Sequence, residues 1–331
     1  MVEAKHWRSV EDGRVACELC PQACVIPEGG HGLCLGRVNR GGKLWAENFG
    51  ECVSAAIDPV EKKPLYHVCP GHDVLSVACN GCNLRCDFCQ NWTIAQTKVD
   101  TSPLPPEALV ELASSRRSFG IAYTYTEPLV WFEYLLEAGS AAHERGLKNL
   151  LVTNGIVNEA PLRELLPLVD AMNVDLKSMT NDFYREYCHV DGLEAVKRTI
   201  RLASEQSFVE VTNLLIPGLN DSEDETEELV DFLADIDPAI PLHFSRYFPT
   251  HKMTVEPTPI ERLRRAKEIA QEKLLYVYVG NVGLGEDSNT YCPEDGNLLV
   301  RRTGYSAEVV GVRGGACSAC GRPADFIWCD D

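Results

Sequence analysis

From residue 72 onward, short apolar strands alternate with amphipathic helices, and this alternation restricts the possible fold more than any other feature of the sequence. The predicted strands cover residues 74–78, 121–125, 150–152, 172–174, 208–211 and 242–244, with one more at 276–279. The predicted helices include residues 129–143, 222–236 and 260–273. Alternating strands and helices build a parallel sheet covered by helices. The sequence therefore predicts an α/β fold in which ligands bind where the strands end.

A cysteine-rich loop, residues 79–92, follows the first of these strands. Cys82, Cys86 and Cys89 stand at C-x3-C-x2-C spacing, which lets three thiolates hold a [4Fe-4S] cubane and leave its fourth iron open. A structural zinc site normally takes four ligands, and a ferredoxin uses four thiolates per cluster. Because Cys79 lies only three residues before Cys82, a closed electron-transfer cluster and a structural zinc site are the alternatives to an open, reactive cluster.

Polar side chains follow four of the predicted strands at the point where each strand ends. They are Thr126, Glu127, Asn154, Asp175, Lys177 and His243. One such residue alone is more often part of a salt bridge or a helix cap, but the carboxyl ends of parallel strands share one edge of the sheet. We therefore expect these side chains to gather beside the cysteine loop.

Four further cysteines, Cys17, Cys20, Cys24 and Cys34, lie in the Gly-rich first 65 residues, which read as a small β-rich lobe with a hairpin at 39–42. Their spacing predicts a second metal site rather than buried free thiols. Thiolates alone do not decide between zinc and an auxiliary iron–sulfur cluster. The linker at 58–65 carries charges that we interpret as a solvated face.

Composition limits the possible partners and the compartment. With 31 Lys and Arg against 49 Asp and Glu, the net charge of -18 argues against binding to nucleic acid or to an anionic membrane. The amino terminus has no apolar signal region and no long apolar run occurs, so we expect a cytoplasmic protein. In a reducing compartment, 15 cysteines favour metal ligation over disulfides.

Over nearly its whole length the chain resembles the radical S-adenosylmethionine (SAM) enzymes of the pyruvate formate-lyase activating-enzyme-like group. It is most similar to the AmmeMemoRadiSam system radical SAM family. The resemblance rests on the cysteine loop, including Phe88 and Asn91, and on several shorter motifs. These are Cys-x2-Cys-Pro-x2-Cys from Cys17, Asp58-Pro59 through His67, Tyr125-Thr126-Glu127-Pro128, Asp175-Leu176-Lys177, Leu215 through Asp221, and His243-Phe244-Ser245-Arg246.

This resemblance implies a partial, open (β/α)6 barrel at residues 66–280, between a Cys-rich lobe at 1–65 and a ribbon-like tail at 281–331. Glu127 would then bind the SAM ammonium, and Asp175 and Lys177 the ribose and carboxylate region. Phe88 and His243 would flank the adenine. The implied chemistry is reductive cleavage of SAM to a 5′-deoxyadenosyl radical, which abstracts hydrogen from a substrate.

The substrate remains open between a small molecule or modified partner and a glycyl radical enzyme that this chain would activate. A non-enzymatic iron–sulfur electron carrier is a further alternative, although it would not need Glu127, Asp175 and Lys177. The implied partners are a one-electron donor such as flavodoxin or ferredoxin, and proteins of the Memo and AMMECR1 types.

The tail departs from the family pattern, which has a cysteine where this chain has Asp295. Cys292, Cys317 and Cys320 resemble the knuckles of a rubredoxin-like ribbon, and zinc also accepts carboxylate oxygen. The sequence predicts a structural zinc site with Asp295 or Cys329 as fourth ligand. The alternative is a ribbon that has lost its metal and is held by packing.

Overall fold

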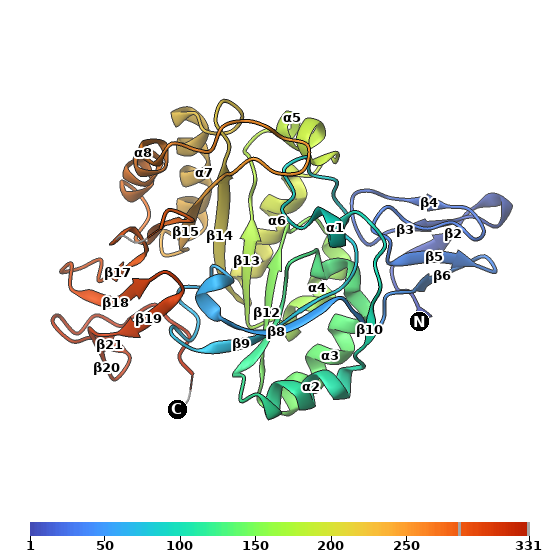
Figure 1. Ribbon diagram of the computed structural model, residues 1–331, viewed down its shortest axis with the longest axis horizontal. Helices are drawn as coiled ribbons and strands as arrows, with labels where there is room; N and C mark the ends of the chain where they lie inside the picture. The colour runs from blue at the N-terminus through green and yellow to red at the C-terminus, as the bar shows by residue number, and fades with distance from the viewer. Residues whose placement is uncertain (284–285, 330–331) are drawn as a thin grey trace.

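A computed structural model describes residues 1–283 and 286–329. Its centre is a sheet of eight strands in the order β16-β15-β14-β13-β12-β11-β9-β8, seen across the middle of Figure 1. The strands are β8 (Ser54–Pro59), β9 (Asp73–Ala78), β11 (Gly120–Tyr123), β12 (Lys148–Thr153), β13 (Ala171–Asp175), β14 (Phe208–Leu215), β15 (Leu242–Arg246) and β16 (Val277–Gly280). All neighbours are parallel except β8, which runs antiparallel to β9.

The predicted α/β fold with a parallel sheet is confirmed. Within the described residues the edge strands β8 and β16 do not pair, so the sheet is open rather than a closed barrel. It holds seven parallel strands, because β16 adds to the six that the resemblance implied. The interiors of these strands are apolar and buried, as expected for strands covered by helices.

Helices fill the connections between the parallel strands. They are α1 (Trp92–Ala95), α2 (Pro106–Ser115), α3 (Phe132–Glu144), α4 (Glu159–Leu165), α5 (Asn181–Phe183), α6 (Leu193–Ser204), α7 (Glu223–Ile236) and α8 (Ile260–Gln271). The start of α7 follows from its sequence, because the Ser222 side chain accepts a hydrogen bond from the Glu225 backbone N–H at 3.2 Å. Helix α3 begins later than the expected residue 129, since a 3-10 turn, Pro128–Trp131, precedes it.

Two smaller β-rich regions lie on opposite sides of the central sheet (Figure 1). The N-terminal region, coloured blue, contains β1 (Val2–Glu3), β2 (Trp7–Ser9), β3 (Val15–Cys17), β4 (Val25–Ile26), β5 (Arg37–Arg40) and β6 (Lys43–Ala46). The expected hairpin at 39–42 is confirmed, because β5 and β6 pair there. Strand β7 (Glu51–Cys52) pairs with β10 (Ser102–Pro103).

The C-terminal region, coloured red, holds β17 (Thr290–Tyr291), β18 (Leu298–Thr303), β19 (Ser306–Val309), β20 (Val312–Arg313) and β21 (Ala316–Cys317).

Helices of the described residues lack the combination of length and apolar character needed to cross a membrane.

Candidate active site

A pocket of about 430 Å³ lies at the carboxyl ends of the parallel strands. It is lined by every side chain that the sequence suggested for the cluster and SAM site. These are Cys82, Cys86, Phe88, Cys89, Asn91, Thr126, Glu127, Asn154, Asp175, Lys177 and His243. The cysteine loop follows β9, and the remaining groups follow or end β11, β12, β13 and β15. The parallel topology thus gathers residues that are up to 161 positions apart, from Cys82 to His243.

The three cysteines of the loop line this pocket, whereas Cys79 does not. Among the described residues, the sulfur atoms of Cys82, Cys86 and Cys89 do not all lie within 4.8 Å of one another, which is wider than one zinc ion requires. The Cys82 sulfur accepts a hydrogen bond from the Leu84 backbone N–H at 3.3 Å. Cys79 is buried, with its sulfur 3.6 Å from the Thr126 hydroxyl. The donor set fits a cluster held by three thiolates with one open iron.

Sequence reasoning missed a fourth thiol beside this set, that of Cys188. It ends a short π-helix, Tyr184–Cys188, and its carbonyl accepts a hydrogen bond from the Arg85 backbone N–H at 3.2 Å. A hydrogen bond from the Cys188 thiol lowers the pKa of Cys86, and burial raises the pKa of Cys188 well above its usual range. A single cysteine in a helical segment carries no spacing signal, so only the fold reveals this neighbour.

Lys177 and Asp175 form the charged wall of the pocket. The Lys177 ammonium lies 2.5 Å from Asp175 Oδ2 and 5.7 Å from the centre of the Phe88 ring. Burial alone would lower the pKa of Lys177, but Asp175 and Cys86 raise it well above its usual range, so the side chain is cationic.

Two buried oxygen atoms of this pocket have no hydrogen-bond partner in the described part of the chain. They are Asp175 Oδ1 and Thr212 Oγ1. A buried polar atom without a partner is costly, and a polar ligand would satisfy it. The pocket therefore fits a ligand with hydroxyl and carboxylate groups, as SAM has.

Glu127 is almost fully buried and holds the ends of two strands together. Its Oε1 accepts hydrogen bonds from the Leu129 N–H and the Thr153 hydroxyl at 3.0 and 2.6 Å, and its Oε2 accepts one from the Asn154 N–H at 2.8 Å. Burial raises the pKa of Glu127 to about 7. Three of the four lone-pair positions of the carboxylate are therefore used inside the protein.

His243 belongs to a buried polar network that the sequence did not predict. Its Nε2 lies 2.6 Å from Glu210 Oε2, and Glu210 Oε1 accepts a hydrogen bond from the His67 N–H at 2.8 Å. The Tyr66 ring packs edge-on against the His243 ring at 4.7 Å between centroids. Glu210 is fully buried in β14, and only its polar character within an apolar strand could have signalled a role.

The prediction that the linker charges at 58–65 form a solvated face is wrong for three of the four, because only Lys62 is exposed. Asp58, Glu61 and Lys63 are each at most 6% exposed. The Lys63 ammonium lies 2.7 Å from Asp58 Oδ2, and burial lowers the pKa of Lys63 to about 8. The linker begins in β8, which pairs with β9 at the edge of the sheet, and it continues beside the pocket, which Glu61 and Lys62 help to line.

The four N-terminal cysteines line a second, smaller cavity. Cys17 and Cys34 are buried, and Cys20 and Cys24 are half-buried. Burial raises the pKa of Cys17 to about 11 and that of Cys20 to about 12.

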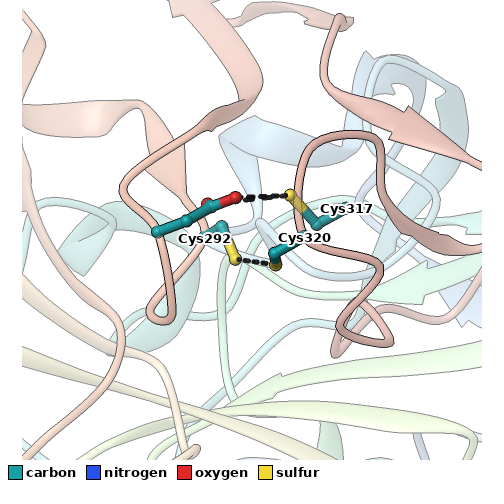
Figure 2. A group of neighbouring side chains, drawn as sticks. Cys292, Cys317 and Cys320 are labelled. Atoms are coloured by element: carbon teal, nitrogen blue, oxygen red, sulfur yellow. Dashed lines mark hydrogen bonds between the residues drawn. The ribbon is translucent and has the colours of Figure 1, made fainter.

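In the C-terminal ribbon, Cys292, Cys317, Cys320 and Asp295 form a compact group whose ligand atoms all lie within 4.8 Å of one another. Figure 2 shows the thiols of Cys292 and Cys320 facing each other, with their sulfur atoms 3.6 Å apart. The Cys317 sulfur lies 3.6 Å from Asp295 Oδ2. This spacing and this donor set suit one tetrahedral zinc ion.

Cys329 does not join this group, which corrects its place as a candidate fourth ligand. It forms a disulfide with Cys69, just before β9. The backbone explains the pairing, because the Cys69 N–H donates to the Ile327 carbonyl and aligns the two segments. The expectation that the cysteines serve metals rather than disulfides is therefore wrong for this pair.

Residues 76–233 match the model of the Radical SAM superfamily. The chain is 43% identical to the uncharacterized protein MJ0808 of Methanocaldococcus jannaschii, covering 99% of this chain and 100% of that one. It is 23% identical to the pyruvate formate-lyase 1-activating enzyme of Escherichia coli, over 47% of this chain and 66% of that one.

Among solved structures, a radical SAM methyltransferase from Sphaerobacter thermophilus superposes with a TM-score of 0.51 at 20% identity, covering 63% of this chain and 66% of that one. This likeness concerns the fold. The family assignment rests on the match over residues 76–233 and on the similarity to the activating enzyme. The chain belongs to the radical SAM superfamily and is homologous to the pyruvate formate-lyase activating enzymes.

Proposed function

We propose that this chain is a radical SAM enzyme in which Cys82, Cys86 and Cys89 hold a [4Fe-4S] cluster and SAM occupies the adjoining pocket. When bound, the two cofactors supply a 5′-deoxyadenosyl radical that abstracts hydrogen from the substrate. The observation that carries the proposal is that the three sulfur atoms and the strand-end polar side chains line one pocket. The two other nearby cysteines, Cys79 and Cys188, do not line it.

The charges in the pocket suggest how SAM is held. The cationic Lys177 would pair with the SAM carboxylate, since a charge-assisted hydrogen bond is strong in a site with little water. Asp175 Oδ1, which has no partner among the described residues, would accept a hydrogen bond from a ribose hydroxyl. Glu127 would offer its remaining lone pair to the SAM ammonium, and Phe88 and His243 would flank the adenine.

We place the substrate in one of two classes. The first is a small molecule or modified partner, in a system with Memo-like and AMMECR1-like proteins, as the resemblance to the AmmeMemoRadiSam family implies. The second is a glycyl radical enzyme, since two homologues are activating enzymes, of pyruvate formate-lyase 1 and of (2S)-3-sulfopropanediol dehydratase. In either case we propose a cytoplasmic protein that receives electrons from a flavodoxin or ferredoxin.

The test is SAM cleavage by the anaerobically reconstituted and reduced full-length protein. We expect 5′-deoxyadenosine and methionine from the wild type and none from Cys86→Ala. Cys79→Ser is the matched control, because this nearby thiol does not line the pocket and its loss should preserve both cluster and cleavage. Wild-type protein that has a full cluster but yields no 5′-deoxyadenosine would instead favour an electron carrier.

We also propose that the ribbon group of Cys292, Asp295, Cys317 and Cys320 binds a structural zinc ion. The group lies in a separate small core around Leu299 and Val300, on the far side of the sheet from the N-terminal region. We divide the chain into the Cys-rich region 1–65, the catalytic region 66–280 and the tail 281–331, which contains this ribbon group. Part of the tail lies outside the described residues.

A further inference from the structure

The N-terminal cysteines surround a cavity whose remaining wall is mostly apolar. Cys17, Cys20, Cys24 and Cys34 line it. The apolar wall includes Leu19, Ile26, Leu129, Val130, Ile156 and Val157. Thiolates that converge on a space shielded by aliphatic side chains form a surrounding that suits a bound metal centre.

The spacing of these sulfur atoms differs from that in the C-terminal ribbon. Because zinc–sulfur bonds are about 2.3 Å long, four thiolates around one zinc ion stand about 3.8 Å apart. The ribbon group satisfies this condition, with all ligand atoms within 4.8 Å of one another. In the described chain, no three of the N-terminal cysteines have sulfur atoms that all lie within this distance of one another. A cubane spreads its ligands farther, because each thiolate binds a different iron.

Arg37 provides an independent sign that an anion belongs in this cavity. Its side chain is only 1% exposed and lines the cavity together with the four cysteines. One guanidinium nitrogen pairs with Glu133 at 2.8 Å, but Nε and the second terminal nitrogen have no partner in the described residues. Buried donors without partners are rare and costly. The sulfur atoms of a thiolate-bound cluster, which carries negative charge, would accept hydrogen bonds from them.

The segment that carries these cysteines contacts the cysteine loop at residues 79–92 directly. The Gln22 amide donates to the Asn83 carbonyl at 2.9 Å, and the Arg85 guanidinium donates to the Leu33 carbonyl. Gly81 lies so close to the Cys34 carbonyl oxygen that an added Cβ would be 2.0 Å from it. Asn83, which directly follows the cluster ligand Cys82, also lines the N-terminal cavity.

We propose that Cys17, Cys20, Cys24 and Cys34 bind a second [4Fe-4S] cluster, closed by four thiolates, which relays electrons to the barrel's cysteine loop. In the relay, a reduced ferredoxin-type donor gives one electron to this cluster, which passes that electron on; no bond to a ligand forms or breaks. The metal assignment stands on the N-terminal residues alone. The relay rests on the proposed function.

The first experiment separates the two sites by iron, sulfide and zinc analysis of the reconstituted full-length chain. In a variant with Cys82, Cys86 and Cys89 all changed to Ala, we expect about four irons and four sulfides, the content of one cubane. Its reduced EPR signal should not change when SAM is added, because a closed cluster has no open iron. Zinc in place of iron at this site would overturn the assignment.

Wild-type protein gives a measurement that does not depend on the folding of that variant, since two cubanes require about eight irons per chain and one requires about four. The matched control is Cys52→Ala, which removes a buried thiol outside both sites and should leave iron unchanged. An iron count of about four in the wild type would refute the second cluster.

The relay is tested in Cys20→Ala/Cys24→Ala, in which the barrel cluster should remain. We expect that reduced ferredoxin no longer reduces the remaining cluster of this variant. Dithionite, in contrast, should still reduce that cluster. Equal reduction of the barrel cluster by ferredoxin in variant and wild type would refute the relay. Failure of the proposed function would appear differently, as absence of 5′-deoxyadenosine from wild-type protein with both clusters present.

Discussion

Replacing Gly81 by alanine tests the contact between the two cysteine loops. Gly81 has a φ of +107°, and a Cβ there would lie 2.0 Å from the carbonyl oxygen of Cys34, a backbone atom that cannot rotate away. A side chain at this φ costs about 1–3 kcal/mol in backbone strain. Forcing the packed segments apart adds about 1–3 kcal/mol. We therefore expect Gly81→Ala to lower the free energy of unfolding by about 2–6 kcal/mol.

Gly41→Ala is the matched control, because Gly41 has a φ of +65° in the same N-terminal region and an added Cβ would meet nothing within 4 Å. It should cost only the left-handed conformation, about 1–2 kcal/mol. Urea unfolding followed by circular dichroism measures both variants, and hydrogen exchange shows whether the loop containing Cys34 loosens in Gly81→Ala alone. Equal costs in the two variants would show that the loops are not packed as described.

Three further predictions concern single side chains. Because burial raises the pKa of Glu127 from 4.5 to about 7, the stabilising contribution of this side chain is complete below about pH 4.5 and is lost as the pH rises through about 7. The free energy of unfolding of the wild type, measured relative to that of Glu127→Gln, should therefore fall by about 3 kcal/mol over this range. A difference between the two proteins that does not change with pH would contradict the shifted pKa. Asp295→Ala should lose zinc from the full-length chain while Cys329→Ser retains it, as measured by metal analysis after dialysis against a chelator; the reverse result would restore Cys329 as the ligand. Glu210→Ala should lower the free energy of unfolding in urea by about 3–5 kcal/mol, because it leaves His243 buried without its partner. Glu210→Gln keeps a hydrogen-bonding group and should lower it clearly less. Equal losses in the two variants would mean that Glu210 and His243 are not coupled.

The parallel sheet and the composition of the pocket could be predicted because both follow from local patterns. Polar residues follow or end four of the strands, β11, β12, β13 and β15, and parallel topology brings those ends together without any long-range information. Asp175 and His243 thus line one pocket although the sequence alone gives no distance between them. The cysteine loop could be predicted for the same reason, since its ligands lie within eight consecutive residues.

Features that depend on contacts between distant segments could not be predicted. Glu210 meets the backbone of His67 across 143 positions, and nothing near either residue signals the other. Lys63 is buried because Asp58 folds back onto it, while its sequence context is that of an exposed charged turn. Cys188 shows the same limit, because its nearness to Cys86 leaves no trace in the spacing of residues.

The disulfide between Cys69 and Cys329 fixes the position of the chain's end and also closes part of the chain into a covalent loop. The bond joins residues separated by 260 positions, so the seven parallel strands of the sheet and the ribbon lie on one closed loop, while the N-terminal 68 residues, which include β8, form a branch outside it. After a single protease cut within that loop, the disulfide still joins the two ends of the cut chain. They separate only when a reductant is added. A cut between Cys34 and Cys69 leaves no covalent link between this loop and the piece that carries all four clustered cysteines. Limited proteolysis without reductant should therefore give intact-size products from cuts in the catalytic region and two separable pieces from cuts in the N-terminal region.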